Sequence, residues 1–197
     1  MTDDASTGTI VVISGPSGSG KTTLVQRILS DDPELVWSVS ATTRAPRAGE
    51  TDGRDYRFLT RETFEAHVNA GKFAEYAESY GNLYGTPAGP LREALEAGRV
   101  MILDIDVQGA RQVIAKFPEA VLVFIRPPDM DTLVQRLRKR STETEEQFAA
   151  RVARARTELD SADEYHHVIV NDDLEVATGE LRALIRKIKE KQGGESR

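Results

Sequence analysis

The glycine-rich segment at residues 15–23, GPSGSGKTT, constrains the fold of this chain more than any other feature of its sequence. Residues 15–22 match the pattern G-x-x-x-x-G-K-[ST] in full. A β-branched apolar run at residues 9–13 precedes the segment, and apolar residues recur at helical spacing between positions 24 and 29. A strand, a glycine-rich loop and a helix in this order are the setting in which the pattern marks a phosphate-binding P-loop. The sequence therefore predicts a P-loop at the end of a buried first strand.

The residue types in this loop indicate how phosphate is bound. Glycines at positions 15, 18 and 20 let backbone N–H groups point inward at phosphate oxygens, where a Cβ would interfere. The N-terminus of the following helix adds a partial positive charge. Lys21 is expected to reach the β and γ phosphates of a nucleotide, and Thr22 to offer its hydroxyl to the accompanying magnesium ion. A flexible glycine turn followed by a surface lysine is the alternative interpretation.

Strand-like runs and helical patterns alternate along much of the chain. The apolar strand-like runs lie at residues 9–13, 36–40, 100–104, 120–125 and 168–170. Amphipathic helical patterns separate most of them, and a last one follows the final run. This alternation predicts an α/β fold, a P-loop parallel sheet with helices on both faces.

Two stretches break the alternation. Residues 42–90 hold short alternating runs, a brief helical pattern and many glycines, and they are predicted to form an inserted small α+β lobe. Residues 133–159 contain two helical patterns around RKRSTETEE, where Thr142 or Thr144 could begin the second helix with a capping box. Without an internal repeat or a long linker, residues 1–197 are predicted to form one domain. Its core is expected at about residues 9–41, 91–132 and 160–192.

The composition excludes several classes of protein. The chain has no cysteine, which rules out disulfide frameworks and thiolate zinc sites. Its 26 basic and 32 acidic residues give a net charge of −6, which argues against broad binding to the phosphate backbone of nucleic acids. The polar, acidic first residues do not resemble a signal peptide, and the apolar runs are too short to span a membrane. We therefore expect a cytoplasmic protein without a membrane or nucleic-acid partner.

Two carboxylates follow the strand-like run at residues 100–104. Asp104 ends this run and Asp106 comes two residues later, at the edge of a parallel sheet where ligands bind. A carboxylate at this edge can act on magnesium through water or on a bound base. For Asp106, an N-cap of the next helix is an equally good interpretation.

A P-loop leaves more than one class of protein open. A switch GTPase is one candidate, because the segment DVQG at residues 106–109 fits the pattern D-x-x-G. The guanine-reading pattern N-K-x-D is missing, however, since NDD at residues 171–173 has no adjoining lysine.

A small-molecule kinase is the other candidate, and it needs a second phosphate-binding site. Arg44 and Arg47 lie three positions apart in a proline-containing loop, so both guanidinium groups could reach one phosphate. Tyr56 and Tyr84 could each donate a phenolic hydrogen bond to the same group. Solvated arginines and half-buried tyrosines are the alternative for these residues taken singly.

Several segments, in order and over nearly the whole chain, resemble those of guanylate kinases. The segments are GPSGSGKTTL, SVSATTRAPRAGE, GRDYRF, FAEYAESYGNLYGT, ILDIDVQGAR, RKRSTETEE and HVIVNDDL. The resemblance implies ATP-dependent conversion of GMP to GDP with magnesium, a GMP-binding lobe at about 42–90 and a helical lid at about 133–159. It also implies roles for individual residues. The residues expected to bind ATP are Gly15, Pro16, Ser17, Gly18, Ser19, Gly20, Lys21, Thr22 and Thr23, with Asn171 near the adenine. The residues expected to hold the GMP phosphate are Ser40, Arg44, Arg47, Tyr56 and Tyr84, and those for the guanine are Glu75, Thr86 and Asp104.

The resemblance assigns the transfer step to cations around the ATP phosphates. Lys21, Arg136, Arg140 and Arg151 are the expected catalytic residues. Phosphoryl transfer asks a protein mainly for alignment and charge neutralisation, so a general base is not required. We expect Arg138, Arg154 and Arg156 to lie on a solvated helix face.

Guanine recognition by Glu75 also has an independent chemical reason. Guanine presents adjacent N1–H and N2–H₂ donors, and one carboxylate can accept from both. Adenine presents an acceptor at N1 and leaves the buried carboxylate unpaired, so such a site discriminates strongly.

A second class of protein shares this resemblance. Non-catalytic interaction modules of scaffolding proteins have a similar fold and bind phosphorylated peptides, so the fold alone does not decide. Those modules typically lack an intact P-loop, whereas this chain keeps every residue of the pattern. The oligomeric state is left open.

Overall fold

The computed structural model describes residues 8–139 and 144–194 of the chain. Its central element is a five-stranded sheet in which every strand pair is parallel, in the order β2-β7-β1-β8-β9. The strands are β1 (Thr9–Ser14), β2 (Val36–Trp37), β7 (Val100–Asp104), β8 (Val121–Arg126) and β9 (His167–Val170). The middle strand β1 is apolar on both faces, as a strand covered by helices on both sides must be.

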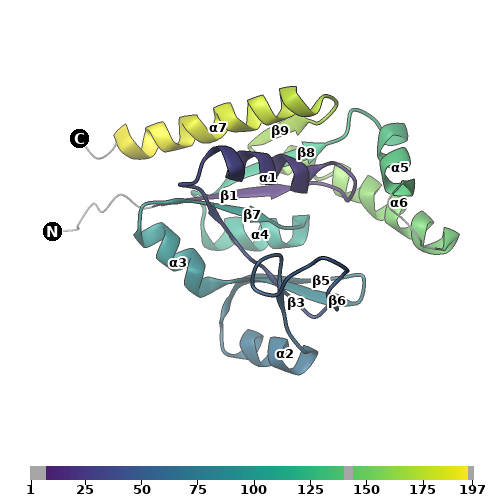
Figure 1. Cartoon of the computed structure of the whole chain (residues 1–197), viewed down its shortest axis with the longest axis horizontal. Coiled ribbons are helices and arrows are strands. Elements are labelled where there is room, and N and C mark those ends of the chain that lie inside the picture. The colour runs from purple at the N-terminus through teal and green to yellow at the C-terminus, as the bar shows by residue number, and fades with distance from the viewer. Residues whose placement is uncertain (1–7, 140–143, 195–197) are drawn as a thin grey trace.

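Helices cover both faces of this sheet (Figure 1), which confirms the predicted fold class. On one face, α1 (Lys21–Asp31) and α7 (Leu174–Gly194) pack against one set of alternate residues of β1, β7 and β8. On the other face, α3 (Ala88–Glu96) and α4 (Val107–Lys116) pack against the opposite set. This arrangement leaves the carboxyl ends of the strands, and the loops that follow them, free to build a site.

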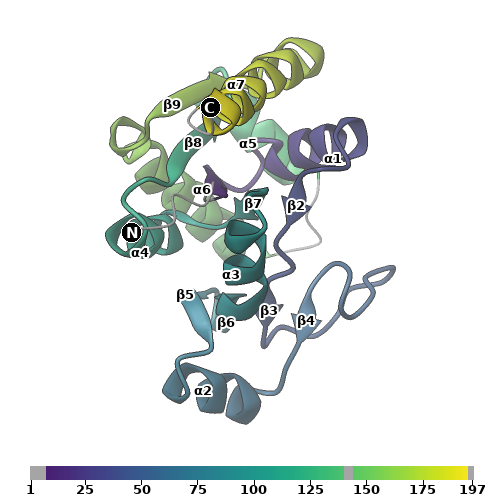
Figure 2. The same ribbon diagram turned by 90° about the vertical axis from the view of Figure 1, so that its left-hand side faces the viewer.

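Residues between β2 and α3 form a second, four-stranded sheet with the order β4-β3-β6-β5. Its strands are β3 (Ala41–Thr42), β4 (Arg57–Phe58), β5 (Phe73–Ser79) and β6 (Asn82–Pro87), and its helix is α2 (Arg61–Asn69). Phe64 of α2 stacks on Phe73 with ring centroids 4.5 Å apart, so this part has a small core of its own. Figure 2 shows this lobe projecting from the core, with α2 at its far end.

Two helices, α5 (Met130–Arg138) and α6 (Glu145–Leu159), lie together at one side of the core (Figure 1). Leu133 and Leu137 of α5 pack against Phe148 and Ala155 of α6. A capping box at Thr144 begins α6, as the sequence predicted for one of two threonines. Thr142 and Arg140 lie outside the described residues. A short 3₁₀ helix, η1 (Ala162–Glu164), leads from α6 to β9.

Two differences from the expected boundaries have a clear physical reason. The strand predicted at 36–40 pairs only over β2, because the chain then leaves the core sheet to enter the lobe. The helix predicted to begin near Gly109 begins at Val107, because Asp106 caps it. Within the described ranges, no helix is both long and apolar enough to cross a membrane.

Candidate nucleotide-binding site

The P-loop lies between β1 and α1 and has the backbone shape that its glycines predict. Gly15, Gly18 and Gly20 have φ values of 140°, 87° and 91°, which L-residues with a side chain rarely adopt. A Cβ at Gly15 would lie 2.0 Å from the carbonyl oxygen of Ile125, and one at Gly20 would lie 2.2 Å from Nδ2 of Asn171. Gly15 is therefore required by close backbone packing as well as by its conformation, and a Cβ at Gly20 would displace the side chain of Asn171.

Lys21 and Ser19 have polar side chains in the loop that a bound anion could contact. Lys21 lies at the start of α1, and its Nζ donates to the carbonyl oxygens of Gly15 at 2.5 Å and Pro16 at 3.3 Å. The Oγ of Ser19 is fully buried and has no hydrogen-bond partner among the residues that the structure describes. A buried hydroxyl without a partner is costly, so its presence in a phosphate-binding loop fits a site that an anion completes.

The structure places one predicted arginine on this loop and a second on Asn171, the residue that supports the loop. Arg151 of α6 donates from Nη2 to Oγ of Ser17 at 2.9 Å. Arg136 of α5 donates from Nη1 to the carbonyl oxygen of Asn171 at 3.0 Å. Asn171 itself donates from Nδ2 to the carbonyl oxygen of Ser19 at 2.8 Å, so its side chain supports the loop backbone directly.

Asp104 faces the hydroxyl that is expected to contact magnesium. Its Oδ2 lies 3.5 Å from Oγ1 of Thr22, across from the start of α1. Burial raises the pKa of Asp104, and the nearby Lys21 opposes that shift. A carboxylate and a hydroxyl oxygen at this edge suit magnesium, which keeps several waters and takes few protein ligands.

Asp106 is occupied as a structural residue. Its Oδ1 accepts from the backbone N–H of Gly109 at 3.0 Å, which makes it the N-cap of α4. Its Oδ2 accepts from Nη2 of Arg154 at 2.9 Å. The capping interpretation of Asp106 is therefore confirmed, and Asp104 rather than Asp106 faces Thr22.

Glu75 is a buried carboxylate on the edge strand β5 of the lobe. It is 3% exposed, and its Oε1 accepts from Oγ1 of Thr86 at 2.6 Å. Burial raises its pKa from 4.5 to about 7, against the opposing hydrogen bond from Thr86. The helix α4 shields it closely, since a Cβ at Gly109 would lie 2.6 Å from Oε2 of Glu75. The two predicted guanine-binding residues of the lobe are thus in contact.

Aromatic residues and one arginine meet elsewhere in the lobe. The rings of Tyr56 and Tyr84 lie 6.1 Å apart, and the guanidinium carbon of Arg44 lies 5.3 Å from the Tyr56 ring centroid. Burial raises the pKa of Tyr56 to about 12, and the charge of Asp104 adds to that shift. Ser40 precedes β3, and its carbonyl oxygen accepts from the backbone N–H of Arg57.

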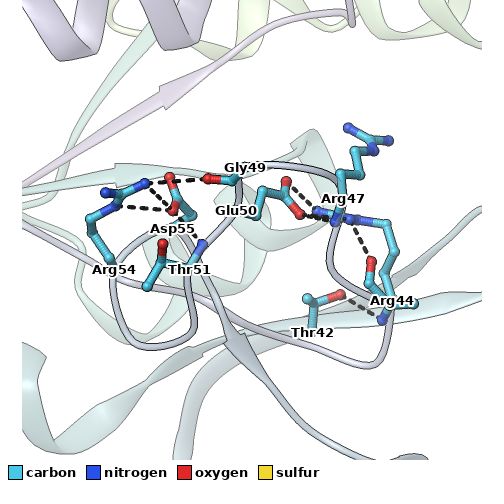
Figure 3. Close-up of polar contacts among 9 residues, drawn as sticks. Thr42, Arg44, Arg47, Gly49, Glu50, Thr51, Arg54 and Asp55 are labelled. Carbon is cyan, nitrogen blue, oxygen red and sulfur yellow. Dashed lines mark hydrogen bonds and ion pairs between the residues drawn. The ribbon is translucent and has the colours of Figure 1, made fainter.

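Sequence reasoning missed Glu50, which holds the predicted phosphate-binding loop together (Figure 3). Both of its carboxylate oxygens accept from Arg44, at 2.8 and 3.0 Å, and Oε2 also accepts from the backbone N–H of Arg47. The side chain of Arg47 is exposed and points away from this carboxylate. No local pattern of the sequence signals this contact, because it depends on the path of an irregular loop.

Arg154 corrects another expectation. The sequence predicts a solvated position, but the side chain is only 27% exposed. It donates hydrogen bonds to Asp106, Glu158 and Ser79. Arg138 has an exposed side chain, as expected, and its guanidinium lies over the ring of Phe148. Arg156 is also exposed.

The parallel sheet, the P-loop after its middle strand and the buried carboxylate of the attached lobe define a P-loop α/β protein of the nucleotide-binding class. The family model described as guanylate kinase matches residues 7–188. The chain belongs to the guanylate kinase family.

Relatives of known name agree over most of their length. The chain is 52% identical over 186 residues to a guanylate kinase of Nocardia farcinica, which covers 93% of this chain and 96% of the relative. It is 49% identical to a guanylate kinase of Rubrobacter xylanophilus, over 92% of this chain and 95% of the relative. A crystal structure of guanylate kinase from Anaplasma phagocytophilum is 34% identical, with a TM-score of 0.79, over 93% of this chain and 87% of that one.

Proposed function

We propose that this chain catalyses the transfer of the γ-phosphate of ATP to GMP, which yields ADP and GDP. The observation that carries the choice of acceptor is the buried pair of Glu75 and Thr86. A buried carboxylate with a raised pKa gains most from a ligand that offers two adjacent N–H donors, and guanine is the nucleobase that does so. Family membership supports the same reaction.

ATP is assigned to the P-loop. Residues 15–23 would surround its phosphates, with backbone N–H groups and Lys21 as the main donors. Arg136 and Arg151 lie against the loop and its support, so they can neutralise charge that spreads over the transferred group. Arg140 is proposed for the same task from the family resemblance alone. The proposed place of Asn171 beside adenine rests on its contact with the loop.

GMP is assigned to the lobe formed by the second sheet. Its phosphate would be held by Ser40, Arg44, Arg47, Tyr56 and Tyr84, and its guanine by Glu75, Thr86 and Asp104. Arg44 is already paired with the Glu50 carboxylate, which takes the positions that two phosphate oxygens would take. Binding of the GMP phosphate therefore requires Glu50 to share or release Arg44.

Magnesium is the expected companion of ATP. Thr22 and Oδ2 of Asp104 would hold it together with the phosphates and water, which leaves Oδ1 of Asp104 for the proposed contact with guanine. Asp106 has both carboxylate oxygens engaged elsewhere. When bound, the ion neutralises phosphate charge. The protein groups align the acceptor phosphate with the γ-phosphate, and the acceptor is already ionised, so no side chain has to remove a proton.

Water competes with GMP as the acceptor. We propose that the lobe of residues 42–90 and the helices of residues 133–159 form a GMP-binding lobe and a lid that close over both nucleotides. Neither alternative function gains support, because the guanine-reading pattern of switch GTPases is missing and the P-loop that non-catalytic modules lack is intact.

The test is release of ADP from ATP and magnesium with GMP, AMP, UMP, CMP and dTMP supplied separately. Strong turnover with GMP alone is expected. Turnover with another acceptor would keep the phosphotransferase but overturn the guanine site. No turnover with any acceptor, from folded protein that binds ATP, would overturn the proposed function.

A further inference from the structure

The guanidinium group of Arg154 in α6 makes four contacts. Three are with other elements, and one is with a residue of the same helix. Arg154 donates from Nη1 to Oγ of Ser79 at 2.8 Å, from Nη2 to Oδ2 of Asp106 at 2.9 Å, and from Nε to Oε1 of Glu158 at 2.8 Å. Its guanidinium carbon also lies 4.9 Å from the ring centroid of Tyr80. We call these five residues the Arg154 cluster.

The members of the Arg154 cluster come from three different parts of the molecule. Ser79 and Tyr80 lie at the hairpin between β5 and β6 of the lobe. Asp106 lies between β7 and α4 of the core, and Arg154 and Glu158 belong to α6. The proposed GMP lobe, the core and the proposed lid therefore meet at one cation.

The cluster is partly shielded from water. The side chains of Arg154, Asp106 and Glu158 are 27%, 24% and 16% exposed. Ion pairs with this degree of burial are screened less by solvent and salt than exposed pairs. Because the guanidinium is planar with fixed donor directions, three acceptors and a ring around it restrict the relative positions of their elements.

The hairpin is shaped to present Tyr80 to this cation. Tyr80 and Gly81 form the two-residue loop between Ser79 and Asn82, and their φ values of 51° and 75° have the signs of a type I′ turn. Tyr80 is the one non-glycine residue with positive φ in the described ranges. An aromatic residue is strained in this conformation, so its position under Arg154 is an independent sign that the contact matters.

The cluster reaches both proposed nucleotide sites. Arg151 lies three positions before Arg154, on the same side of α6, and contacts Ser17 of the P-loop. Through Asp106, Arg154 also fixes the first turn of α4, where Gly109 packs against Glu75. One helix thus carries one arginine to the P-loop and another to the elements around Glu75.

We propose that Arg154 is a positioning residue that couples the binding of GMP to the binding of ATP. It holds the β5–β6 hairpin, α4 and α6 in one arrangement, so that occupation of the GMP site favours the position of α6 in which Arg151 meets the P-loop. This inference rests on the proposed function, because it needs both nucleotides to bind. Coupling of this kind is reciprocal, so each nucleotide raises the affinity for the other by the same factor.

The experiment measures the dissociation constant of GMP by calorimetry, with and without a saturating non-hydrolysable ATP analogue and magnesium. In the unsubstituted protein we expect the analogue to tighten GMP binding at least fivefold. Arg154→Gln is expected to reduce this factor to less than twofold, while the affinity for GMP alone changes less than threefold. Arg154→Lys keeps the positive charge but not the planar set of guanidinium donors, and we expect an intermediate coupling factor. Arg156→Gln, on an exposed position of the same helix, is the matched control and should keep the original factor.

Several outcomes decide against the proposal. An unchanged coupling factor in folded Arg154→Gln protein, an equal loss in the Arg156→Gln control, or no coupling in the unsubstituted protein would each overturn it. If Arg154→Gln does not fold, Ser79→Ala removes the hairpin contact alone and must lower the factor at least twofold. Failure of the unsubstituted protein to bind GMP at all would instead contradict the proposed function.

Discussion

Glu75 is held where its protonated form is favoured, which gives the protein a specific dependence on pH. Its pKa of about 7 in the folded state lies above the ordinary value of 4.5, because the side chain is buried. The folded chain therefore keeps a proton that the unfolded chain has lost between these pH values. The contribution of Glu75 to the free energy of unfolding is fully present below pH 4.5 and is lost as the pH rises through about 7.

A comparison with Glu75→Gln isolates this effect. We expect the free energy of unfolding to fall between pH 5 and pH 8 by about 2.5 kcal/mol more in the unsubstituted protein than in the variant. Urea unfolding at both pH values, without nucleotides, measures it. Equal changes in the two proteins would show that Glu75 is already ionised at pH 5.

The same substitution tests base recognition. Glu75→Gln replaces one acceptor by an N–H₂ donor that faces the donors of guanine, so the KM for GMP should rise at least tenfold. The affinity for ATP should change less than twofold. Among the residues that the structure describes, the side chain of Glu75 forms its hydrogen bond with Thr86 and not with the P-loop. Steady-state kinetics with each substrate varied measures both, and equal losses would contradict the assignment of guanine to Glu75.

Residues with local signals were predictable, and residues with distant partners were not. The P-loop pattern is contiguous, so the sequence located Lys21 and Thr22 without help from the fold. Arg154 contacts Ser79 and Asp106, which lie 75 and 48 positions before it in the sequence. Its spacing to Glu158 is that of an ordinary surface ion pair on a helix. Glu50 likewise acts through a loop geometry that no periodicity encodes.

At the level of elements, Gly179 and Gly109 both lie in helices, but alanine should be tolerated at Gly179 and should disturb a neighbouring side chain at Gly109. Alanine in place of a helical glycine usually stabilises a helix by up to about 1 kcal/mol. Gly179 of α7 has open space around a Cβ, whereas a Cβ at Gly109 of α4 would lie 2.6 Å from Glu75. Gly179→Ala should therefore stabilise the protein with unchanged activity.

Gly109→Ala should displace the Glu75 carboxylate and raise the KM for GMP several-fold. Thermal unfolding and the kinetics of both variants provide the measurement. A Gly109→Ala variant with unchanged KM for GMP would show that α4 does not shape the guanine site.

The elements of the core were predictable because each buries a regular apolar pattern. The run at 100–104 matches β7, and the pattern after the P-loop matches α1. The strand predicted at 36–40 was too long, because the apolar pattern continues where the backbone pairing stops. Apolar character reports burial, whereas pairing depends on which neighbouring strand is present.

At the level of the whole molecule, the two attached parts are expected to move when both nucleotides bind. Closure removes water from the site and strengthens the electrostatic contacts inside it. Small-angle X-ray scattering with GMP, with a non-hydrolysable ATP analogue and magnesium, and with both should show the smallest radius of gyration with both. An identical radius in all states would argue against closure.

The order of the strands has a consequence for how the protein is made. β1 leaves the ribosome before β7 and β8, but it lies between these two strands in the sheet. It has no neighbour in this sheet until β7 has been synthesised, and it has only one until β8 is complete at Arg126. Gly15 packs against Ile125, near the end of β8. The P-loop is thus translated long before β8, the strand that it needs to acquire its shape. Nascent chains that stop before residue 121 should not retain ATP, so nucleotide binding can report the completion of folding during translation.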